Sequence, residues 1–220
     1  MRDLHMTRFL PCYFLLASCA LAQSTTPIDN DQVKVIVAYE KPRVQTPMHE
    51  HQFNRVVIYE QGGSQEIVSM KVKPYTINFK AGEARWFPAG GVHKSEIFSP
   101  TPVPIVEIEI KKPGNPSLMP TSLDPVKLDP KHYKVEFEND QVRVLRVTIG
   151  PHESTPVHQH PVNRVVTYLT DQDFRVTSPN GKVETVKHNV GEVVWSGPAT
   201  HKEENMSNKP FEVVVTEIKN

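Results

Sequence analysis

Short runs of alternating hydrophobic and polar residues, rich in valine and isoleucine, recur along the chain between turn-forming residues. Alternation with a period of two is typical of a β-strand that buries one face. No long stretch shows helical periodicity, and prolines outnumber glycines by 20 to 10. The sequence therefore predicts an all-β protein. In the first half of the chain, the expected strands cover residues 33–39, 54–60, 66–70, 75–79, 85–87 and 103–111.

Most of the chain is present in two copies. The segment TPMHEHQFNRVVIY (46–59) reappears as TPVHQHPVNRVVTY (155–168), at an offset of 109 residues from His49 to His158. The offset holds over most of each copy, until the second copy loses one residue after Gly191. A repeat of this length predicts two copies of one fold rather than a single large domain.

The region between the two copies contains prolines at positions 113, 116, 120, 125 and 130. Proline fixes φ and cannot donate to a ladder, so residues 113–131 are expected to form an extended linker. The predicted division is an N-terminal domain over 23–112 and a C-terminal domain over 132–220. Residues 23–27 are expected to be a polar lead without regular structure. Many short strands in each domain indicate a closed barrel or a double sheet.

The N-terminus has the pattern of a secretory signal peptide, with arginines, an apolar run at 9–21 and small residues around a cleavage site after Ala22. We expect residues 1–22 to be removed and the protein to be periplasmic or secreted. In a second interpretation, Leu-Ala-Ser-Cys ending at Cys19 is a lipobox and the lipidated cysteine anchors the protein. In a third, the run is a retained membrane span. If cleavage follows Ala22, the mature chain has no transmembrane span and no cysteine, so histidine must lead any metal site.

Charged residues are balanced, with 25 lysines and arginines against 25 aspartates and glutamates, and no basic run accumulates. A nucleic-acid-binding domain carries a basic patch or stripe, so nucleic acid is not an expected partner. The sequence also lacks a G-x-S-x-G motif and a phosphate-binding glycine loop. The candidate chemistry therefore rests on the histidines.

Each copy contains an H-x-H pair that runs into a β-branched stretch, and alternate residues of a strand point to the same side. A third histidine follows downstream at matching places. Three imidazoles form a chelating set for a divalent transition metal such as Fe, Zn, Ni, Cu or Mn. The structural alternative is a set of interior histidines that bind water and hydroxyl groups without any metal. The six candidate ligands are His49, His51, His93, His158, His160 and His201.

These motifs resemble the cupin family, whose first motif has H-x-H followed by a glutamate and whose second has glycine, P-x-G, histidine and asparagine. The first copy matches the second motif at Gly82, Pro88, Gly90 and His93, with Ile97 in place of the asparagine, and the second copy matches at Gly191, His201 and Asn205, with Gly197 in the proline region. The resemblance covers nearly the whole mature chain. It implies a bicupin with two tandem jelly-roll barrels, the conserved barrel of cupin proteins.

The family's metal-binding glutamate is missing from both copies. Its place falls on Arg55 or Val56 in the first copy and on Arg164 or Val165 in the second. A guanidinium stays cationic and cannot ligate a metal, although it can hold an anionic group of a substrate. The remaining ligands would be three histidines, similar to the cupin dioxygenases that use no carboxylate ligand.

Two pairs of residues near the histidines leave alternatives open. Arg55 and Arg164 could recognise an anion in each cavity, or could occupy a shared strand-entry turn with the side chain reaching to solvent. Tyr59 and Tyr168 could be proton donors in the pocket, or could pack in the core. All four are candidate substrate-binding residues.

Other titratable residues are expected to lie outside the site. Glu96 and Glu204 stand three residues beyond the third histidine, and odd spacing places them on the opposite face of the strand. A solvated role is favoured over that of a displaced fourth ligand. The remaining histidines are expected on the surface or in turns: His5, His132, His152 and His188.

Two functions from different classes follow from the resemblance. The first is an exported bicupin that binds a divalent metal and, if it is an enzyme, carries out dioxygenase chemistry on a small organic substrate. The second is a non-catalytic bicupin that binds a small molecule or an anion through degenerate metal sites. A third interpretation divides the labour, with one active barrel and one structural barrel. Bicupins can form homo-oligomers, but no interface can be recognised in the sequence. The sequence identifies no catalytic residue.

Overall fold

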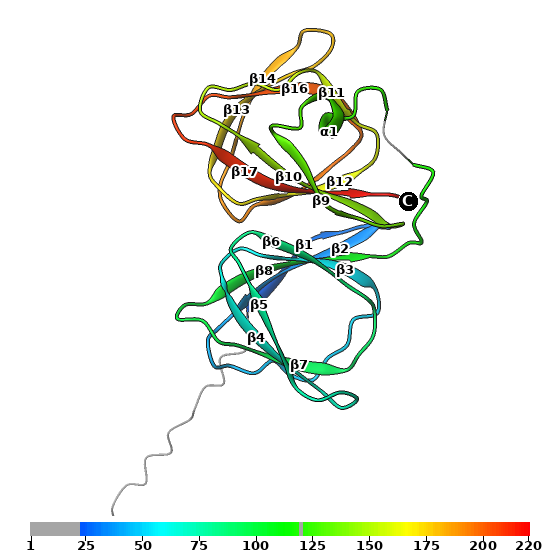
Figure 1. Ribbon diagram of the computed structural model, residues 1–220, viewed down its shortest axis with the longest axis vertical. Helices are drawn as coiled ribbons and strands as arrows, with labels where there is room; N and C mark the ends of the chain where they lie inside the picture. Colours follow the sequence, from blue (N-terminus) through cyan, green and yellow to red (C-terminus); the bar gives the residue numbers. More distant parts are fainter. Residues whose placement is uncertain (1–22, 119–120) are drawn as a thin grey trace, which may run out of the picture.

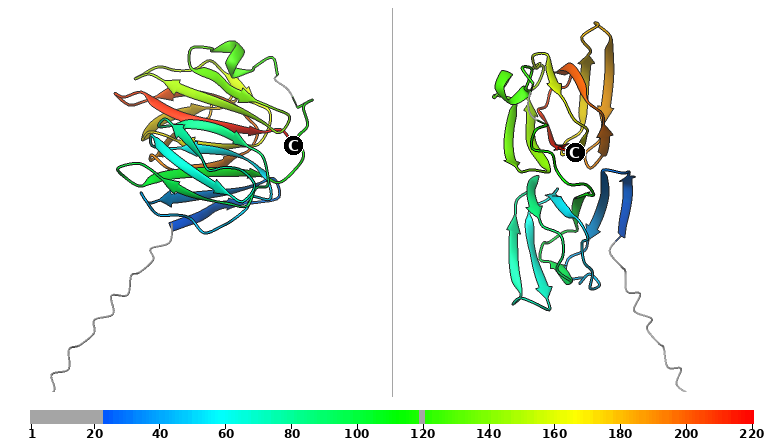
Figure 2. Two further views of the ribbon diagram at one scale, coloured as in Figure 1. Left: turned by 60° about the horizontal axis from the view of Figure 1, so that its bottom comes forward. Right: turned by 90° about the vertical axis from the view of Figure 1, so that its right-hand side faces the viewer.

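The computed structural model describes residues 23–118 and 121–220. The predicted signal peptide, with Cys12, Cys19 and His5, lies outside these residues. The described chain folds into two β-barrels, stacked one above the other in Figure 1 and seen from two further sides in Figure 2. Nearly all regular structure is antiparallel strand, which confirms the all-β prediction and the tandem barrels.

The first barrel is made of a five-stranded sheet in the order β1-β2-β8-β3-β6 and a three-stranded sheet in the order β5-β4-β7. In β2 and β4 the buried residues come from alternate strand positions, as the period-two pattern predicts. Its strands are β1 Gln23–Asp29, β2 Val33–Glu40, β3 Asn54–Tyr59, β4 Gly63–Ser69, β5 Tyr75–Phe79, β6 Glu83–Phe87, β7 His93–Ile97 and β8 Val103–Ile110.

The second barrel repeats this arrangement with a five-stranded sheet in the order β15-β12-β17-β10-β9 and a four-stranded sheet in the order β11-β16-β13-β14. A one-turn helix, α1, precedes it. Its elements are α1 Pro125–Leu128, β9 Tyr133–Glu138, β10 Val142–Ile149, β11 His158–His160, β12 Arg164–Tyr168, β13 Gln172–Thr177, β14 Val183–His188, β15 Val193–Ser196, β16 Ala199–Asn205 and β17 Phe211–Ile218.

The two five-stranded sheets pack against each other through a hydrophobic cluster to which both barrels contribute valines and isoleucines. Two equivalent hydrogen bonds cross this contact. Asn54 donates to Gln141 at 2.6 Å, and its counterpart Asn163 donates to Gln32 at 2.6 Å. The repeated asparagine therefore joins the barrels, while the arginine that follows it points into a cavity. Each barrel keeps a further hydrophobic cluster inside.

Two local expectations were wrong. The polar lead at residues 23–27 is part of β1, because its backbone pairs with β2 at the edge of the sheet. The proline-rich connector is not extended throughout, since it contains α1. Pro125 occupies the first turn of this helix, where its missing N–H costs nothing, and the side chain of Asp124 accepts a hydrogen bond from the N–H of Val126 at 3.1 Å.

The motif glycines are explained by backbone conformation. Gly82 and Gly191 have φ values of +74° and +84°, a region that residues with a Cβ rarely adopt. Their N–H groups donate to the carbonyls of Tyr59 and Tyr168 at 2.7 and 2.8 Å. These turns set where the chain enters β6 in the first barrel and β15 in the second. Both strands pair with the strand that carries the arginine.

Candidate metal centres

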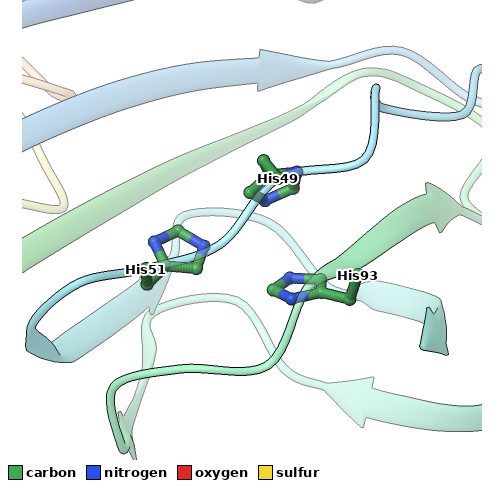
Figure 3. Close-up of side chains that lie close together, drawn as sticks. All are labelled: His49, His51 and His93. Atoms are coloured by element: carbon green, nitrogen blue, oxygen red, sulfur yellow. The ribbon is translucent and has the colours of Figure 1, made fainter. Parts of the chain in front are cut away.

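The three histidines of the first barrel come together, as Figure 3 shows. His49 and His51 precede β3, and His93 opens β7. Two backbone hydrogen bonds of 2.9 and 2.8 Å join His49 to His93. The ring centroids are 4.6 Å apart for His49 and His93, 5.1 Å for His49 and His51, and 5.5 Å for His51 and His93. One nitrogen of each ring lies within 4.8 Å of the other two.

The second barrel repeats this geometry with its own three histidines. His158 and His160 form the ends of β11, which pairs with β16 so that His158 lies opposite His201. The centroids are 4.6 Å apart for His158 and His201, 5.2 Å for His158 and His160, and 5.7 Å for His160 and His201. All three residues are buried. The structure thus brings all six sequence-predicted ligands into two groups of three.

Backbone carbonyls fix the tautomer of three of these histidines. The Nδ1 atoms of His49, His93 and His158 lie 2.9, 2.6 and 3.0 Å from the carbonyl oxygens of Pro47, Gly91 and Pro156. A carbonyl only accepts, so each Nδ1 carries the proton and donates. The lone pair is then on Nε2, the atom available to a metal.

A carboxylate takes the same role behind the second histidine of each pair. His51 Nδ1 is 3.2 Å from Glu109, and His160 Nδ1 is 2.7 Å from Glu217. The hydrogen bond to His51 lowers the pKa of Glu109. Burial alone would raise the pKa of Glu217, but bonds from His160 and from Arg143 at 2.5 Å outweigh it and lower the pKa to about 2. Such carboxylate–histidine pairs orient metal ligands in known metal sites.

The protonation state of the histidines also suits metal binding. Burial lowers the pKa of His93, His158 and His201, and that of His201 falls to about 4. Neutral imidazole is the form that binds a metal, so at neutral pH these side chains need not lose a proton first.

One unsatisfied atom in each barrel supports a metal at these positions. In the first barrel, Nε2 of His51 is buried and has no hydrogen-bond partner. In the second, the Tyr133 hydroxyl lies 3.1 Å from His158 Nε2 and 3.1 Å from an oxygen of Glu203. Both atoms are acceptors, while the phenol has one proton to donate. A cation bound by the histidines would satisfy the acceptor that is left over, so the residues present fit a divalent metal.

A cavity opens beside each group of histidines. The first has a volume of about 340 Å³ and is lined by His49, His93, Arg55, Tyr59, Gln65, Glu40 and Glu107, among others. The second has a volume of about 260 Å³ and is lined by His160, His201, Arg164, Tyr168, Phe174, Glu203 and Tyr133, among others. Both can hold a small organic molecule beside the imidazoles.

The two arginines are buried in these cavities but differ in their surroundings. Arg55 is 7% exposed, and its Nε lies 3.2 Å from Glu107 without the alignment of a hydrogen bond. Arg164 is 8% exposed and donates to the carbonyl of Gly197. Among residues 23–118 and 121–220, no ion pair involves Arg164. The side chains face the cavities rather than solvent.

The two tyrosines line the cavities and also pack against other rings. Tyr59 stacks on Phe79 at 3.9 Å, and its hydroxyl donates to Gln65 at 3.3 Å. Tyr168 stacks on His188 at 4.0 Å. Burial raises the pKa of both phenols, so they are neutral donors at physiological pH.

Sequence reasoning missed four polar residues of the cavities. Glu203 is two residues beyond His201 on β16, and this even spacing could have indicated it, because it places the side chain on the same face. Glu40, Glu107 and Tyr133 come from β2, β8 and β9, which reach the histidines only through strand pairing. No local motif marks them.

The residues expected outside the sites mostly lie there. Glu96 bonds to Gln45 at the surface, and Glu204 pairs with Arg175 at 3.1 Å. His152 is exposed in a turn. His188 differs from the expectation in part, because it lies at the end of β14, pairs with Glu192 and stacks on Tyr168 of the second cavity. The surface prediction for one histidine was wrong: His132 is only 6% exposed, because Asp129 and Glu153 bind its two ring nitrogens at 2.6 and 2.8 Å.

Comparisons with solved structures agree with this architecture. An oxalate decarboxylase from Bacillus subtilis, described with Mn(II) centres, superimposes with a TM-score of 0.62 at 13% identity, over 90% of this chain and 72% of that one. A cupin 2 conserved barrel domain protein from Leptotrichia buccalis gives 0.56 at 15% identity, over 91% and 90%. AerE from Microcystis aeruginosa gives 0.60 at 13% identity, over 91% and 98%. No protein-family model and no curated protein matches the sequence.

These similarities, together with the two stacked barrels, show that the chain has the bicupin fold. Sequence identities of this size establish the fold and leave the activity to the site itself. The cupin fold with two groups of three histidines fits metal binding. In the part of the chain that the structure describes, no helix is long and apolar enough to cross a membrane.

Proposed function

We propose that this protein is an exported bicupin that binds one divalent transition metal in each barrel and performs dioxygenase chemistry on a small organic substrate. His49, His51 and His93 hold the metal in the first barrel, and His158, His160 and His201 hold it in the second. The division into barrels over 23–112 and 132–220, with a linker over 113–131, is part of the same proposal. The metal is Fe, Zn, Ni, Cu or Mn.

The observation that carries the proposal is the convergence of three imidazole nitrogens within 4.8 Å in each barrel. Support comes from the Nδ1 atoms, which are held by carbonyl or carboxylate oxygens in five of the six rings. A histidine with a purely structural role does not require a fixed ring orientation at both nitrogens, because water or a hydroxyl group can bond to either one. Neighbouring rings that turn lone pairs toward one point repel each other, and a cation held between them removes this repulsion.

The residues of the cavity have defined tasks in this function. A metal held by three imidazoles supplies Lewis-acid or redox chemistry at its open coordination positions. Arg164 and Arg55 bind an anionic group of the substrate and orient the molecule toward the histidines. The neutral phenols of Tyr59 and Tyr168 donate hydrogen bonds, and the aliphatic walls exclude water from the reacting end.

A second candidate function is the binding of a small anion without catalysis. The absence of an ion-pair partner for Arg164 among the described residues favours it, because a buried guanidinium that faces a cavity is a ready site for a carboxylate or phosphate group. In this function the ligand stabilises the protein through Arg164, and chelators have no effect.

Two measurements test these functions. Oxygen uptake by metal-reconstituted protein with phenolic, diketone and flavonol substrates should show turnover that His158→Ala or His49→Ala reduces and that the two substitutions together abolish. Thermal shifts with small carboxylates, with and without a chelator, separate the two candidates. Stabilisation that survives chelation and disappears in Arg164→Ala favours the anion-binding function, whereas stabilisation that chelation removes favours the metal-dependent one.

A further inference from the structure

Glu203 is placed on the side of β16 that faces the metal-binding histidines of the second barrel. Because it stands two residues beyond His201 on a regular strand, both side chains point into the same cavity. Its neighbour Glu204 points the other way and pairs with Arg175 at 3.1 Å. The side chain of Glu203 is 21% exposed, and it is part of the cavity wall.

The carboxylate of Glu203 is close to one ligand nitrogen and is linked to a second through Tyr133. One oxygen lies 3.7 Å from Nε2 of His201. The other accepts a hydrogen bond of 3.1 Å from Tyr133, whose hydroxyl is 3.1 Å from Nε2 of His158. Neighbouring donor atoms around a zinc-like ion with bonds of about 2.1 Å lie about 3.0–3.4 Å apart. The distance from the nearer oxygen to His201 Nε2 therefore exceeds the separation of two ligands of one ion by only a few tenths of an ångström.

Tyr133 explains how this carboxylate is held. Its single proton faces two acceptors, Glu203 and His158 Nε2, because the Nδ1 of His158 already donates to Pro156. A metal on Nε2 leaves the phenol free to donate to Glu203. One oxygen of Glu203 is then fixed by Tyr133, and the other is oriented for the metal.

The first barrel lacks both residues. Strand pairing places Ser95 where the second barrel has Glu203, and Ser24 where it has Tyr133. The first cavity contains two carboxyl groups instead. Glu40 is held by Gln65 and Ser95, and Glu107 lies beside Arg55 and 3.4 Å from Nδ1 of His51, on the side of the ring away from the metal position. Among the described residues, neither lies within ion-pair distance of a histidine Nε2, so only three imidazoles are placed to bind a metal there.

We infer that the second barrel is a four-ligand site, in which Glu203 joins His158, His160 and His201 and replaces the carboxylate missing at Arg164. This inference rests on the proposed metal binding. An anionic ligand strengthens the binding of a divalent cation, so the second barrel binds such a metal more tightly than the first.

The test uses Co(II) as a spectroscopic probe in a chain whose first site is disabled by His49→Ala and His51→Ala. Glu203→Gln in this background should weaken Co(II) binding about 10-fold or more, the least expected from losing an oriented metal contact. It should also shift the visible absorption of bound Co(II), since an oxygen donor leaves the coordination sphere. The matched control Glu204→Gln, on the opposite face of the same strand, should change neither the affinity nor the spectrum.

Each outcome separates this inference from the proposed function. If the parent chain binds no Co(II), metal binding by the second barrel fails. If it binds and Glu203→Gln leaves both affinity and spectrum unchanged, Glu203 is not a ligand, although the metal site stands. Titration of the wild-type chain with Co(II) tests the inference without any substitution at Glu203. It should reveal two sites with different affinities and spectra, and two indistinguishable sites would contradict the inference.

Discussion

The two barrels share the scaffold that orients their histidines but differ in the polar residues of their cavities. Glu109 and Glu217 occupy equivalent strand positions and each binds a histidine Nδ1. Other equivalent strand positions at the cavities differ in chemistry. In the order first barrel then second, these include Glu40 and Ile149, Gln65 and Phe174, Ser95 and Glu203, Glu107 and Val215, and Ser24 and Tyr133.

The two cavities therefore offer different chemical groups to a ligand beside the three histidines. The first cavity holds two carboxyl groups, and one of them lies against Arg55. The lining of the second includes one carboxylate, Glu203, and an arginine without an ion-pair partner among the described residues. An anionic ligand therefore meets a more favourable field in the second barrel, which agrees with the hypothesis of divided labour.

The largest effect on stability is expected at Glu217. Its folded pKa of about 2 lies below the ordinary value of 4.5, so it stabilises the protein fully above pH 4.5, and this contribution is lost as the pH falls toward 2. Its size is about 3 kcal/mol. Glu217→Gln should flatten the pH dependence of urea unfolding between pH 2 and 5. Glu109→Gln should do so less, because Arg143 has no arginine counterpart in the first barrel, where Lys34 stands. Equal changes in the pH dependence of the two variants would contradict the expectation that Arg143 strengthens the contribution of Glu217.

An effect of opposite sign is expected at Glu40. Burial and the neighbouring Glu107 raise its pKa to about 7, against weaker hydrogen bonds from Gln65 and Ser95. The native state then holds a proton that the unfolded chain releases above pH 4.5, so stability falls as the pH rises from 4.5 through 7, by about 3 kcal/mol at most. Glu40→Gln should remove this loss in unfolding experiments between pH 5 and 9. A variant with the same decline as the wild type would contradict the raised pKa.

A smaller effect is expected for anion binding. Arg164→Ala should weaken the binding of a small carboxylate such as benzoate about tenfold or more, the value of one charged hydrogen bond. Arg55→Ala should have less effect, since Glu107 already offsets its charge. Isothermal titration calorimetry on metal-loaded protein measures both. If the two variants lose affinity equally, the electrostatic difference between the cavities does not govern binding.

The sequence predicted those features that rest on short-range patterns. Alternation predicted the strands, and the duplicated motif with its glycine turn predicted both barrels and the two groups of histidines. The strand β1 was missed because its residues, QSTTPID, lack apolar alternation and are ordered by pairing with β2. Tyr133 was missed for a related reason, since β9 brings it to His158 only through the pairing of β9 with β10.

The arginines mark the boundary of what could be predicted. The sequence alone did not decide whether Arg55 and Arg164 lie in a surface turn or face the cavity. The direction of a side chain at the start of a strand depends on the sheet that the strand joins. The packing of the two five-stranded sheets decides the direction of the arginines. Asn54 and Asn163 turn toward the other barrel, so the residue that follows each of them faces the interior of its own barrel.

The central claim, that each barrel holds a metal, is tested most directly by the metal content of purified chains reconstituted with one divalent metal and passed over a desalting column. Elemental analysis should find about two metal ions per wild-type chain, one for each three-histidine group. His49→Ala and His158→Ala should each retain about one. A wild-type chain without metal, or variants that keep the wild-type content, would contradict the account.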